Sequence, residues 1–382
     1  MKIVTIIGAR PQIIKAAALS RAIKNHFSNE IKEVIVHTGQ HYDANMSQIF
    51  IDELDIPFPD YNLNIGSASH GIQTARMIEG IEKILLKEKP DYLVLYGDTN
   101  STLAGAIAAS KIHIPIAHIE AGLRSHNKSM PEEINRIMCD HASTLLFSPT
   151  KTGYENLIRE GFNPENTPPF NADNPAIFHC GDVMFDNSRY FEKIAKNNST
   201  ILKKHDLVDK PFILSTIHRD NNTDNPERLT AILGALLQIS EAEKTEIVLP
   251  LHPRTSKLLD KNLQNNLYEE LKKSPFIKLI PPVSFLDMIM LESHCQLIMT
   301  DSGGVQKEAF FFNKPAVILR SETEWKEIVE QGCGIIADAD SKKIKDAYYH
   351  FKKVKNSLVF PSIFGDGNAA KFIALTMLEN KI

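Results

Sequence analysis

The chain has 382 residues, of which 43% are hydrophobic and 24% are charged. This length exceeds what one hydrophobic core usually supports, so two domains are expected, and the composition excludes a disordered protein. The 43 Lys and Arg residues against 47 Asp and Glu residues give a formal net charge of −4. Because no block of like charge concentrates this excess, the sequence excludes a nucleic-acid partner and a membrane-surface partner.

The cysteines stand far apart, without a CxxC pair or a close Cys-His cluster, which indicates buried thiols in a reducing compartment. The first apolar run, 3–7, is too short for a signal peptide. No stretch reaches the ~18 apolar residues of a membrane span. We therefore expect a cytoplasmic protein.

Short β-branched strands alternate with longer helical patterns along the whole chain, which is typical of βαβ units and a parallel sheet. The strands are apolar throughout, as expected for strands buried on both faces. The pattern predicts an α/β fold with two Rossmann-like, doubly wound domains that face each other across a cleft. The predicted strands are 3–7, 34–37, 92–96, 116–119, 212–216, 246–249, 277–280, 297–300 and 316–319.

A Pro- and Asn-rich stretch, NPENTPPFNADNP at 163–175, predicts the domain boundary. We expect an N-terminal domain at 1–172 and a C-terminal nucleotide-binding domain at 173–365. A helical pattern at about 366–382 closes the chain and could pack back on the first domain. Ligands of open α/β sheets bind at the carboxyl ends of the strands, where nearly all unusual residues of this chain stand.

The first of these turns is GARPQIIK, 8–15, where Arg10 and Lys15 flank a helix start. Two cations beside a helix N-terminus would hold an anion. The dinucleotide fingerprint GxGxxG and the P-loop GxxxxGK[ST] are both absent, which disfavours NAD binding and ATP hydrolysis by the usual sites. The anion is therefore expected to be part of a nucleotide-linked substrate.

Carboxylates follow the next strands, with Asp98 in GDTNST, Glu120 in EAGLRS, and Glu132 and Glu133 in MPEEINR. Asp98 could serve only as a helix cap, and Glu132 and Glu133 could only favour a first helical turn. Glu120 is harder to explain in this way, because it lies between a strand and Ala-Gly. Carboxylates that share a site with phosphate repel one another, which yields an acid and a base at neutral pH.

In the second half, TDSGG at 300–304 joins a strand to a helix. Free backbone N–H groups and a helix start suit a phosphate, although a tight turn with Ser302 as the N-cap explains the same residues. Glu308, one helical turn further, could accept hydrogen bonds from ribose hydroxyls or could face solvent.

Two His-Arg pairs end neighbouring strands, His218 with Arg219 and His252 with Arg254. A lone histidine at a strand end is more often structural than catalytic, but two pairs at equivalent positions weaken that interpretation. The other histidines show no ligand spacing, so no metal is expected. These include His113, His118, His141 and His179.

The motifs GARP, TGQH, GDTNST, EAGLRS, PEEINR, a strand-end His-Arg, LHPR and TDSGG, in this order, resemble the non-hydrolysing UDP-N-acetylglucosamine 2-epimerases. The resemblance covers nearly the whole chain. It implies the two-domain GT-B fold, a homodimer, a cytoplasmic location and no metal or nicotinamide cofactor. It also implies inversion of C2 of a UDP-linked 2-acetamido sugar, through elimination of UDP to a 2-acetamidoglucal and re-addition on the other face.

By resemblance, the catalytic candidates are Asp98, Glu120, Glu132 and His218. The residues implied to hold UDP and the sugar are Arg10, Lys15, Arg136, Arg219, His252, Arg254, Ser302, Gly303, Gly304 and Glu308.

Three segments depart from the family pattern. Tyr42-Asp43 replace a pair that contacts an activating second UDP-sugar in bacterial members, DNNTDNPERL at 220–229 replaces a different loop, and Trp325 replaces an arginine. The last two resemble the branch that epimerises UDP-2,3-diacetamido-2,3-dideoxyglucuronate. UDP-N-acetylglucosamine is the first expected substrate, and that uronate is the second.

Three other functions remain open. A hydrolysing epimerase would release free N-acetylmannosamine, a GT-B glycosyltransferase would need an acceptor, and a sensor would bind the UDP-sugar without turnover. The ordered carboxylate motifs of the first domain speak against the transferase, and the presence of all four catalytic candidates speaks against the sensor.

Overall fold

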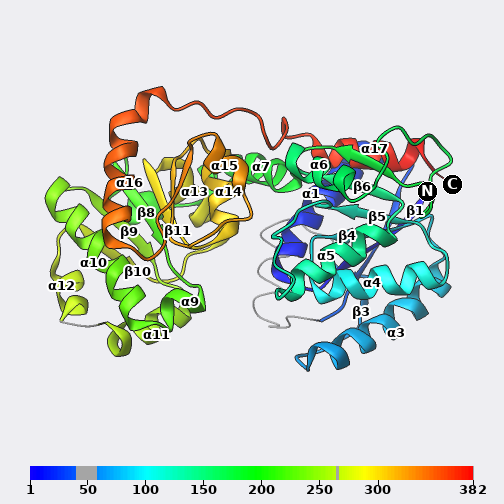
Figure 1. The fold of residues 1–382 in the computed structure, drawn as a ribbon, viewed down its shortest axis with the longest axis horizontal. Coiled ribbons are helices and arrows are strands. Elements are labelled where there is room, and N and C mark those ends of the chain that lie inside the picture. Colours follow the sequence, from blue (N-terminus) through cyan, green and yellow to red (C-terminus); the bar gives the residue numbers. More distant parts are fainter. Residues whose placement is uncertain (40–57, 264–265, 382) are drawn as a thin grey trace. The chain divides into compact units, whose positions relative to one another are not determined.

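A computed structural model describes residues 1–39, 58–263 and 266–381. The chain divides into two compact units, the first formed by Met1–Arg189 with Ser362–Ile382 and the second by Tyr190–Pro361 (Figure 1). The chain thus passes from the first unit to the second after residue 189, whereas the sequence predicts the domain boundary after residue 172. The difference arises because the strand β7 (Ala176–His179) pairs in parallel with β6 (Leu145–Ser148) of the first unit.

The first unit is built on a parallel sheet whose described strands have the order β3-β2-β1-β4-β5-β6-β7. Its central strand, β4, is apolar and fully buried, and the neighbouring β1 is buried beyond Lys2, as strands covered on both faces must be. The remaining strands stand on either side of this pair. The strands not yet delimited are β1 (Lys2–Ile7), β2 (Lys32–His37), β3 (Tyr61–Asn62), β4 (Tyr92–Tyr96) and β5 (Ile116–Ile119).

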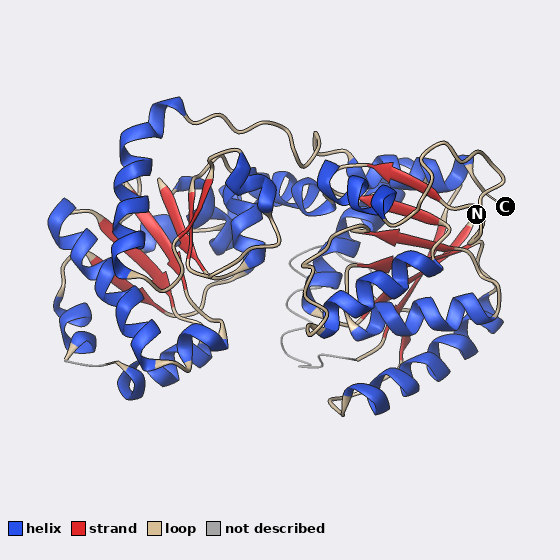
Figure 2. Ribbon diagram, in the orientation of Figure 1, coloured by secondary structure: helices blue, strands red, loops and turns tan. Residues whose placement is uncertain are grey.

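Helices cover both faces of this sheet (Figure 2). On one face α3, α4 and α5 lie side by side, and on the other α1 packs against α17 (Figure 1). The closing segment of the chain therefore belongs to the first unit. The helices are α1 (Arg10–His26), α3 (His70–Glu88), α4 (Asn100–Lys111), α5 (Pro131–Ala142), α6 (Lys151–Arg159), α7 (Val183–Asn198), which continues into the second unit, and α17 (Ala369–Glu379).

The second unit repeats the arrangement, with described strands in the parallel order β10-β9-β8-β11-β12-β13. The strands are β8 (Phe212–Thr216), β9 (Glu246–Pro250), β10 (Ile277–Ile280), β11 (Leu297–Thr300), β12 (Ala316–Ile318) and β13 (Gly334–Ile336). The helical elements are α8 (Ile201–Lys204), α9 (Asp220–Thr223), α10 (Pro226–Glu243), α11 (Pro253–Asn262), α12 (Leu267–Lys273), α13 (Phe285–His294), α14 (Gly303–Phe311), α15 (Lys326–Glu330), α16 (Ser341–Val354) and the short 3-10 helix η1 (Lys355–Ser357).

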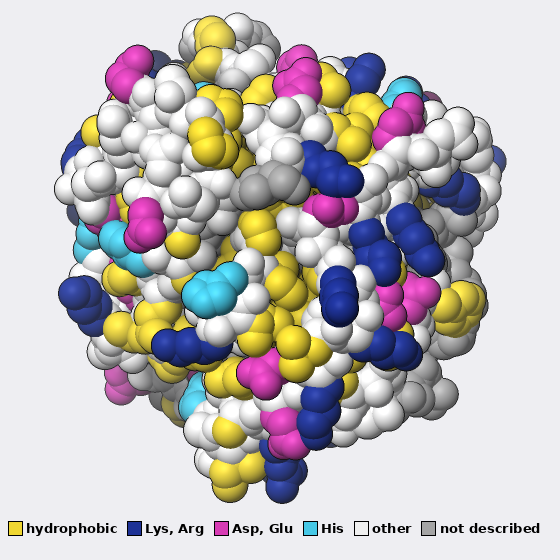
Figure 3. Space-filling view, turned by 90° about the vertical axis from the view of Figure 1, so that its right-hand side faces the viewer, with side chains coloured by type: hydrophobic (Ala, Val, Ile, Leu, Met, Phe, Trp, Pro, Cys, Tyr) yellow, Lys and Arg dark blue, Asp and Glu magenta, His cyan; other side chains and the backbone are white. Residues whose placement is uncertain are grey.

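Each unit has its own apolar core between its sheet and its helices. Two parallel, doubly wound sheets confirm the predicted α/β fold class with Rossmann-like topology. On the face shown in Figure 3, described basic and acidic side chains are interspersed with apolar ones. No helix within the described ranges has both the length and the apolar character needed to cross a bilayer.

Candidate active site

Three separate motifs of the first unit meet at Gly8. The hydroxyl groups of Thr38 and Ser101 lie 2.8 Å apart, and a Cβ at Gly8 would come within 2.3 Å and 2.1 Å of these two oxygens. Gln12 accepts hydrogen bonds from the Gly8 and Ala9 amides and donates one to the Tyr96 carbonyl at 3.0 Å. The start of α1 is thereby joined to the turn that follows β4.

The turn after β4 holds Asp98 in an ion pair with Arg136 of α5. The Asn135 amide donates to the Asp98 carbonyl at 2.8 Å, so α5 holds both the side chain and the backbone of this residue. Thr99, and not Asp98, is the N-cap of α4, because the Thr99 hydroxyl accepts from the Thr102 amide. The helix-cap interpretation of Asp98 is therefore wrong.

Glu120 is the first residue after β5 and forms an ion pair with Lys15 of α1. Its side chain is 12% exposed, and its φ of +75° lies in the left-handed region that residues other than Gly, Asn and Asp rarely adopt. Strained backbone of this kind concentrates at functional sites. Since β4 and β5 are neighbours in the sheet, the Asp98 and Glu120 turns lie at adjacent strand ends.

The two glutamates at the start of α5 have different surroundings. Glu133 is 1% exposed and accepts hydrogen bonds from the Ser125 and His126 amides, both at 2.9 Å. It also pairs with Arg136 at 3.0 Å, so it fixes the loop before α5. Glu132 is exposed, and its charge raises the pKa of Asp98.

Burial raises the pKa of Asp98 above its usual value, while Arg136 and Lys15 oppose that shift and Glu120 reinforces it. The described residues therefore include a carboxyl group that holds its proton more tightly than an exposed aspartate. A charged neighbour, Glu120, lies close enough to act on it. This arrangement provides one group disposed to donate a proton beside another that can accept one.

In the second unit the turn after β8 is held by Asp301, which directly follows β11 and is fully buried. Its carboxylate accepts from the backbone amides of His218 at 3.1 Å and Arg219 at 3.0 Å, and from the Asn222 side chain at 3.1 Å. Asp301 is a functional residue that the sequence motifs did not single out. The signal was its place between a strand and the glycines of TDSGG.

His218 lies over this carboxylate, with Nδ1 3.4 Å from Asp301 Oδ1, and its ring is 5.8 Å from that of His252. Burial lowers the pKa of His218, Asp301 opposes the shift, and Arg219 and His252 add to it. The ring is therefore expected to be neutral at pH 7. The described part of the structure brings together three of the predicted residues here: His218, Arg219 and His252.

Ser302 is the N-cap of α14, with its hydroxyl 3.4 Å from the Val305 amide, and Gly303 and Gly304 are the first helical residues. Both interpretations of TDSGG are thus compatible, because a capped helix start also presents free N–H groups. A Cβ at Gly303 would lie 2.2 Å from Glu324 Oε1, whereas one at Gly304 would meet only Ser302 Oγ, at 3.8 Å. The side of the turn at Gly304 is open.

Glu308, further along α14, contacts the fully buried Glu292 of α13. Burial and the Glu308 side chain raise the pKa of Glu292 well above its usual range, which favours the protonated form of this carboxyl group. Trp325 is 4% exposed and lies under the Lys307 ammonium group, 4.2 Å from the ring centroid. Its Nε1 would be 3.6 Å from a Cβ at Gly303, which places this departure from the family pattern beside the TDSGG turn.

The side chains of the other predicted residues are not described by the structure. Arg10 opens α1 and Arg254 lies in α11, but their side chains, like Tyr42-Asp43, fall outside the described part of the structure. Across the described ranges, no group of three or more His, Cys, Asp or Glu side chains is arranged to hold a metal ion.

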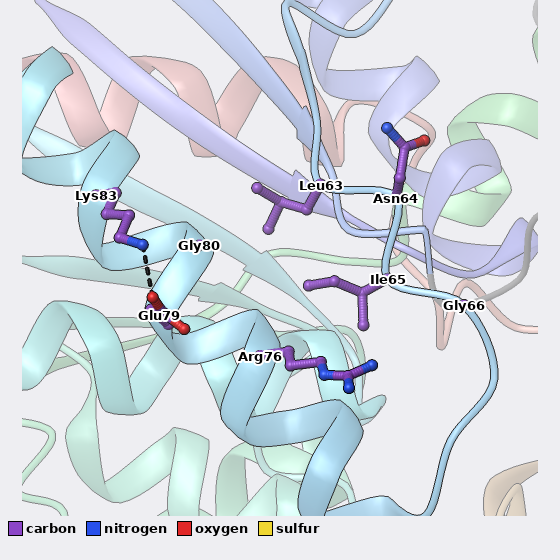
Figure 4. A pocket seen from close by; sticks show the side chains of 8 residues that line it. All are labelled: Leu63, Asn64, Ile65, Gly66, Arg76, Glu79, Gly80 and Lys83. Atoms are coloured by element: carbon purple, nitrogen blue, oxygen red, sulfur yellow. Dashed lines mark hydrogen bonds and ion pairs between the residues drawn. The ribbon is translucent and has the colours of Figure 1, made fainter.

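A pocket of about 340 Å³ lies elsewhere in the first unit, between the loop after β3 and α3 (Figure 4). A Lys83–Glu79 ion pair of 2.5 Å stands on its helical wall. None of the sequence-predicted site residues lines it. The lining residues are Leu63, Asn64, Ile65, Gly66, Arg76, Glu79, Gly80 and Lys83.

Known proteins match this chain over its whole length. A protein-family model described as UDP-N-acetylglucosamine 2-epimerase matches residues 22–378. A UDP-N-acetylglucosamine 2-epimerase from Methanocaldococcus jannaschii is 43% identical over 384 aligned positions, which cover 100% of both chains. A UDP-2,3-diacetamido-2,3-dideoxy-D-glucuronate 2-epimerase from Pseudomonas aeruginosa is 49% identical over 339 positions, which cover 89% of both chains.

Solved structures agree with these matches. The crystal structure of the M. jannaschii UDP-GlcNAc 2-epimerase with UDP-GlcNAc and UDP superposes with a TM-score of 0.83 at 41% identity, covering 99% of this chain and 100% of that one. The UDP-GlcNAc 2-epimerase of Neisseria meningitidis gives the same TM-score at 28% identity. The predicted GT-B fold is therefore confirmed. The chain belongs to the UDP-N-acetylglucosamine 2-epimerase family.

Proposed function

We propose that this protein interconverts UDP-N-acetylglucosamine and UDP-N-acetylmannosamine. One observation carries the proposal: Asp98 and Glu120 stand at adjacent strand ends, each paired with its own cation, Arg136 and Lys15. Proton removal from C2 and its return on the opposite face need two carboxyl groups in different protonation states. The raised pKa of Asp98 supports such a division of roles.

In the forward step a base removes the C2 proton, the C1–O bond breaks, and UDP departs with the bonding electron pair. The product is 2-acetamidoglucal. In the return step a proton adds to C2 on the other face while a phosphate oxygen of UDP bonds to C1. We assign proton transfer to Asp98, Glu120 and Glu132 of the first unit and to His218 of the second unit.

The second unit supplies groups for the nucleotide. The open helix start at Ser302–Gly304 would stabilise the charge that develops on the departing diphosphate, and Glu308 would accept from the ribose hydroxyls. Arg219 and His252 are exposed beside His218 and would contact the phosphates. We assign Arg10 and Arg254 to the same task, and Lys15 and Arg136 to orienting the carboxylates with which they pair.

The test is proton NMR of the protein with UDP-N-acetylglucosamine in D2O. The proposal predicts loss of the H2 signal through deuterium incorporation and the growth of a manno-configured UDP-sugar. Absence of exchange in a folded protein that binds UDP would exclude this substrate. Growth of free N-acetylmannosamine in place of the UDP-sugar would instead show the hydrolysing reaction.

A second substrate, UDP-2,3-diacetamido-2,3-dideoxyglucuronate, is favoured by Trp325 beside the TDSGG turn and by 49% identity to the P. aeruginosa enzyme named for that sugar. The same deuterium experiment with both substrates present together at equal concentration gives the ratio of their kcat/KM values, because competing substrates react in that ratio. A hundredfold preference for the uronate would reassign the substrate and retain the reaction.

The homodimer and the cytoplasmic location stay predictions from the family resemblance. Light scattering coupled to size exclusion checks the first, with the mass of the 42.9 kDa chain as the monomer reference. Fractionation of the producing cells checks the second.

A further inference from the structure

A buried histidine lies beneath the two turns that carry Asp98 and Glu120. His118, in β5, is fully buried, and its Nε2 lies 2.8 Å from the Gly97 carbonyl oxygen. Its Nδ1 lies 2.7 Å from Asp140 Oδ1. Burial opposes the charge of Asp140, but His118 and Arg124 lower the pKa of this carboxyl group. A carbonyl oxygen and an ionised carboxylate can only accept, so the ring donates from both nitrogens as an imidazolium.

Asp140 extends this link to the second turn. Its other oxygen accepts from the Gly122 amide at 3.1 Å and pairs with Arg124 at 2.7 Å. Asp140 is fully buried, as His118 is. Burial opposes a charged ring, but the Cys139 side chain and the Asp140 carboxylate hold the pKa of His118 well above its usual range.

Stability alone is a poor explanation for such a group of charges. Buried ion pairs commonly contribute no more than an apolar cluster of the same volume, because desolvation offsets the attraction. One of the turns that the cluster holds also has an unusual backbone, because φ is +75° at Glu120, a residue with a side chain. A backbone of this kind persists only where its surroundings determine it.

We propose that His118 and Asp140 are positioning residues that hold the Asp98 and Glu120 turns at a fixed separation. His118 fixes the carbonyl that precedes Asp98, and Asp140 fixes the amide two residues after Glu120. The inference rests on the proposed function, in which both carboxyl groups handle the C2 proton. Misplacement of a reacting group by about 1 Å costs roughly a hundredfold in rate.

Two substitutions separate the two bonds of the ring. In His118→Gln the amide nitrogen takes the place of Nε2 and keeps the bond to Gly97, whereas in His118→Asn it takes the place of Nδ1 and keeps only the bond to Asp140. We expect kcat to fall about a hundredfold in His118→Asn and less than about tenfold in His118→Gln. KM and the Kd for UDP should stay within about twofold of wild type in both, and His26→Gln, at an exposed site, should match wild type.

A folded His118→Asn protein with wild-type kcat overturns the proposal. So does an equal loss of kcat in both variants accompanied by weaker UDP binding, because that pattern marks general destabilisation. Wild-type protein that turns over neither UDP-sugar defeats the proposed function separately.

If the variants do not fold, nitrogen-15 NMR of histidine-labelled wild-type protein provides the decision. One ring should keep two protons that exchange slowly at pH 8. Finding only singly protonated rings at that pH overturns the proposal.

Discussion

The carboxyl edges of the two sheets have the same topology and different chemistry. In the first unit the turns after β4 and β5 contain residues with positive φ and present carboxylates paired with Lys15 and Arg136. In the second unit the turn residues 218–219 after β8 and 301–304 after β11 all have negative φ. These turns present the backbone amides of a helix start and a histidine, His218, whose lowered pKa favours its neutral form. The fold provides the positions, and the turn residues decide between proton transfer and anion binding.

Glu120→Gln is the variant with the largest expected effect, and it tests whether proton transfer belongs to the carboxyl edge of the first sheet. The amide cannot accept a proton, so turnover should fall about a thousandfold, within the range of general acid–base contributions. The Kd for UDP should change less than about threefold, because Glu120 is not among the groups assigned to the nucleotide, which apart from Arg10 lie in the second unit. Stopped assays and calorimetric titration with UDP measure the two effects.

The matched control is Glu165→Gln, a change of the same kind at an exposed loop position. If Glu120→Gln loses affinity for UDP by the same factor as turnover, the assignment of proton transfer to the first sheet edge and anion binding to the second is wrong.

The second test concerns the strained backbone of the first edge. A Cβ at Gly122 would lie 2.2 Å from the Gly153 carbonyl oxygen, and φ there is +79°. Gly122→Ala should therefore lower the free energy of unfolding by about 3 kcal/mol or more through overlap and left-handed strain together. Chemical denaturation measures the change.

Gly161→Ala isolates the strain, since φ is +98° and nothing lies within 4 Å of the added Cβ. We expect about 1 kcal/mol for that variant. Equal losses in the two alanine variants would show that close packing does not matter at Gly122.

The third test concerns the second edge. In Asp301→Asn one oxygen becomes an NH2 group that faces the backbone amides of His218 and Arg219. We expect a loss of about 2 kcal/mol in stability and roughly a tenfold weaker affinity for UDP. Asp340→Asn is the control, because Asp340 caps α16 at the surface and Asn is an equally good cap.

Retained UDP affinity in Asp301→Asn would mean that the turn after β8 does not take part in holding the nucleotide. The comparison would then rest on the Ser302–Gly304 helix start alone.

The last test concerns pH. Burial raises the pKa of Asp186 from 3.8 to about 6, although the Ala369 and Ala370 amides favour its charged form. A raised carboxyl pKa stabilises the fold below the unfolded value and loses that contribution as pH rises through the folded value. The stability of wild type relative to Asp186→Asn should therefore fall by roughly 2 kcal/mol between pH 4 and pH 7. Urea titrations at both pH values measure it, and a flat difference would contradict the shift.

The fold was largely predictable because apolar runs and glycine turns are local signals. The strands predicted at 92–96, 116–119 and 212–216 match β4, β5 and β8. Strand β7 was not predicted, because its four residues follow the Pro- and Asn-rich stretch, and the boundary was consequently placed too early. Only pairing with β6, a tertiary contact, assigns those residues to the first unit.

The candidate site also has features that local sequence predicts and features that only the fold shows. Asp98 and Glu120 were predictable as strand-end carboxylates, whereas their ion pairs with Arg136 and Lys15 were not. Lys15 stands 105 residues from Glu120, and the pairing depends on how α1 crosses the sheet. His118 reads as one polar residue in an apolar strand, and only the fold shows that it joins two turns.

The discontinuity of the first unit also has a consequence for biosynthesis. Helix α17 covers α1, and the Tyr92 hydroxyl donates to the carbonyl of Asn380, so the first unit needs residues that follow the entire second unit in the chain. During translation the apolar surface of α1 stays uncovered while Tyr190–Pro361 emerges from the ribosome. The second unit, a continuous segment, can complete its core first, although β1 and α1 are made before it.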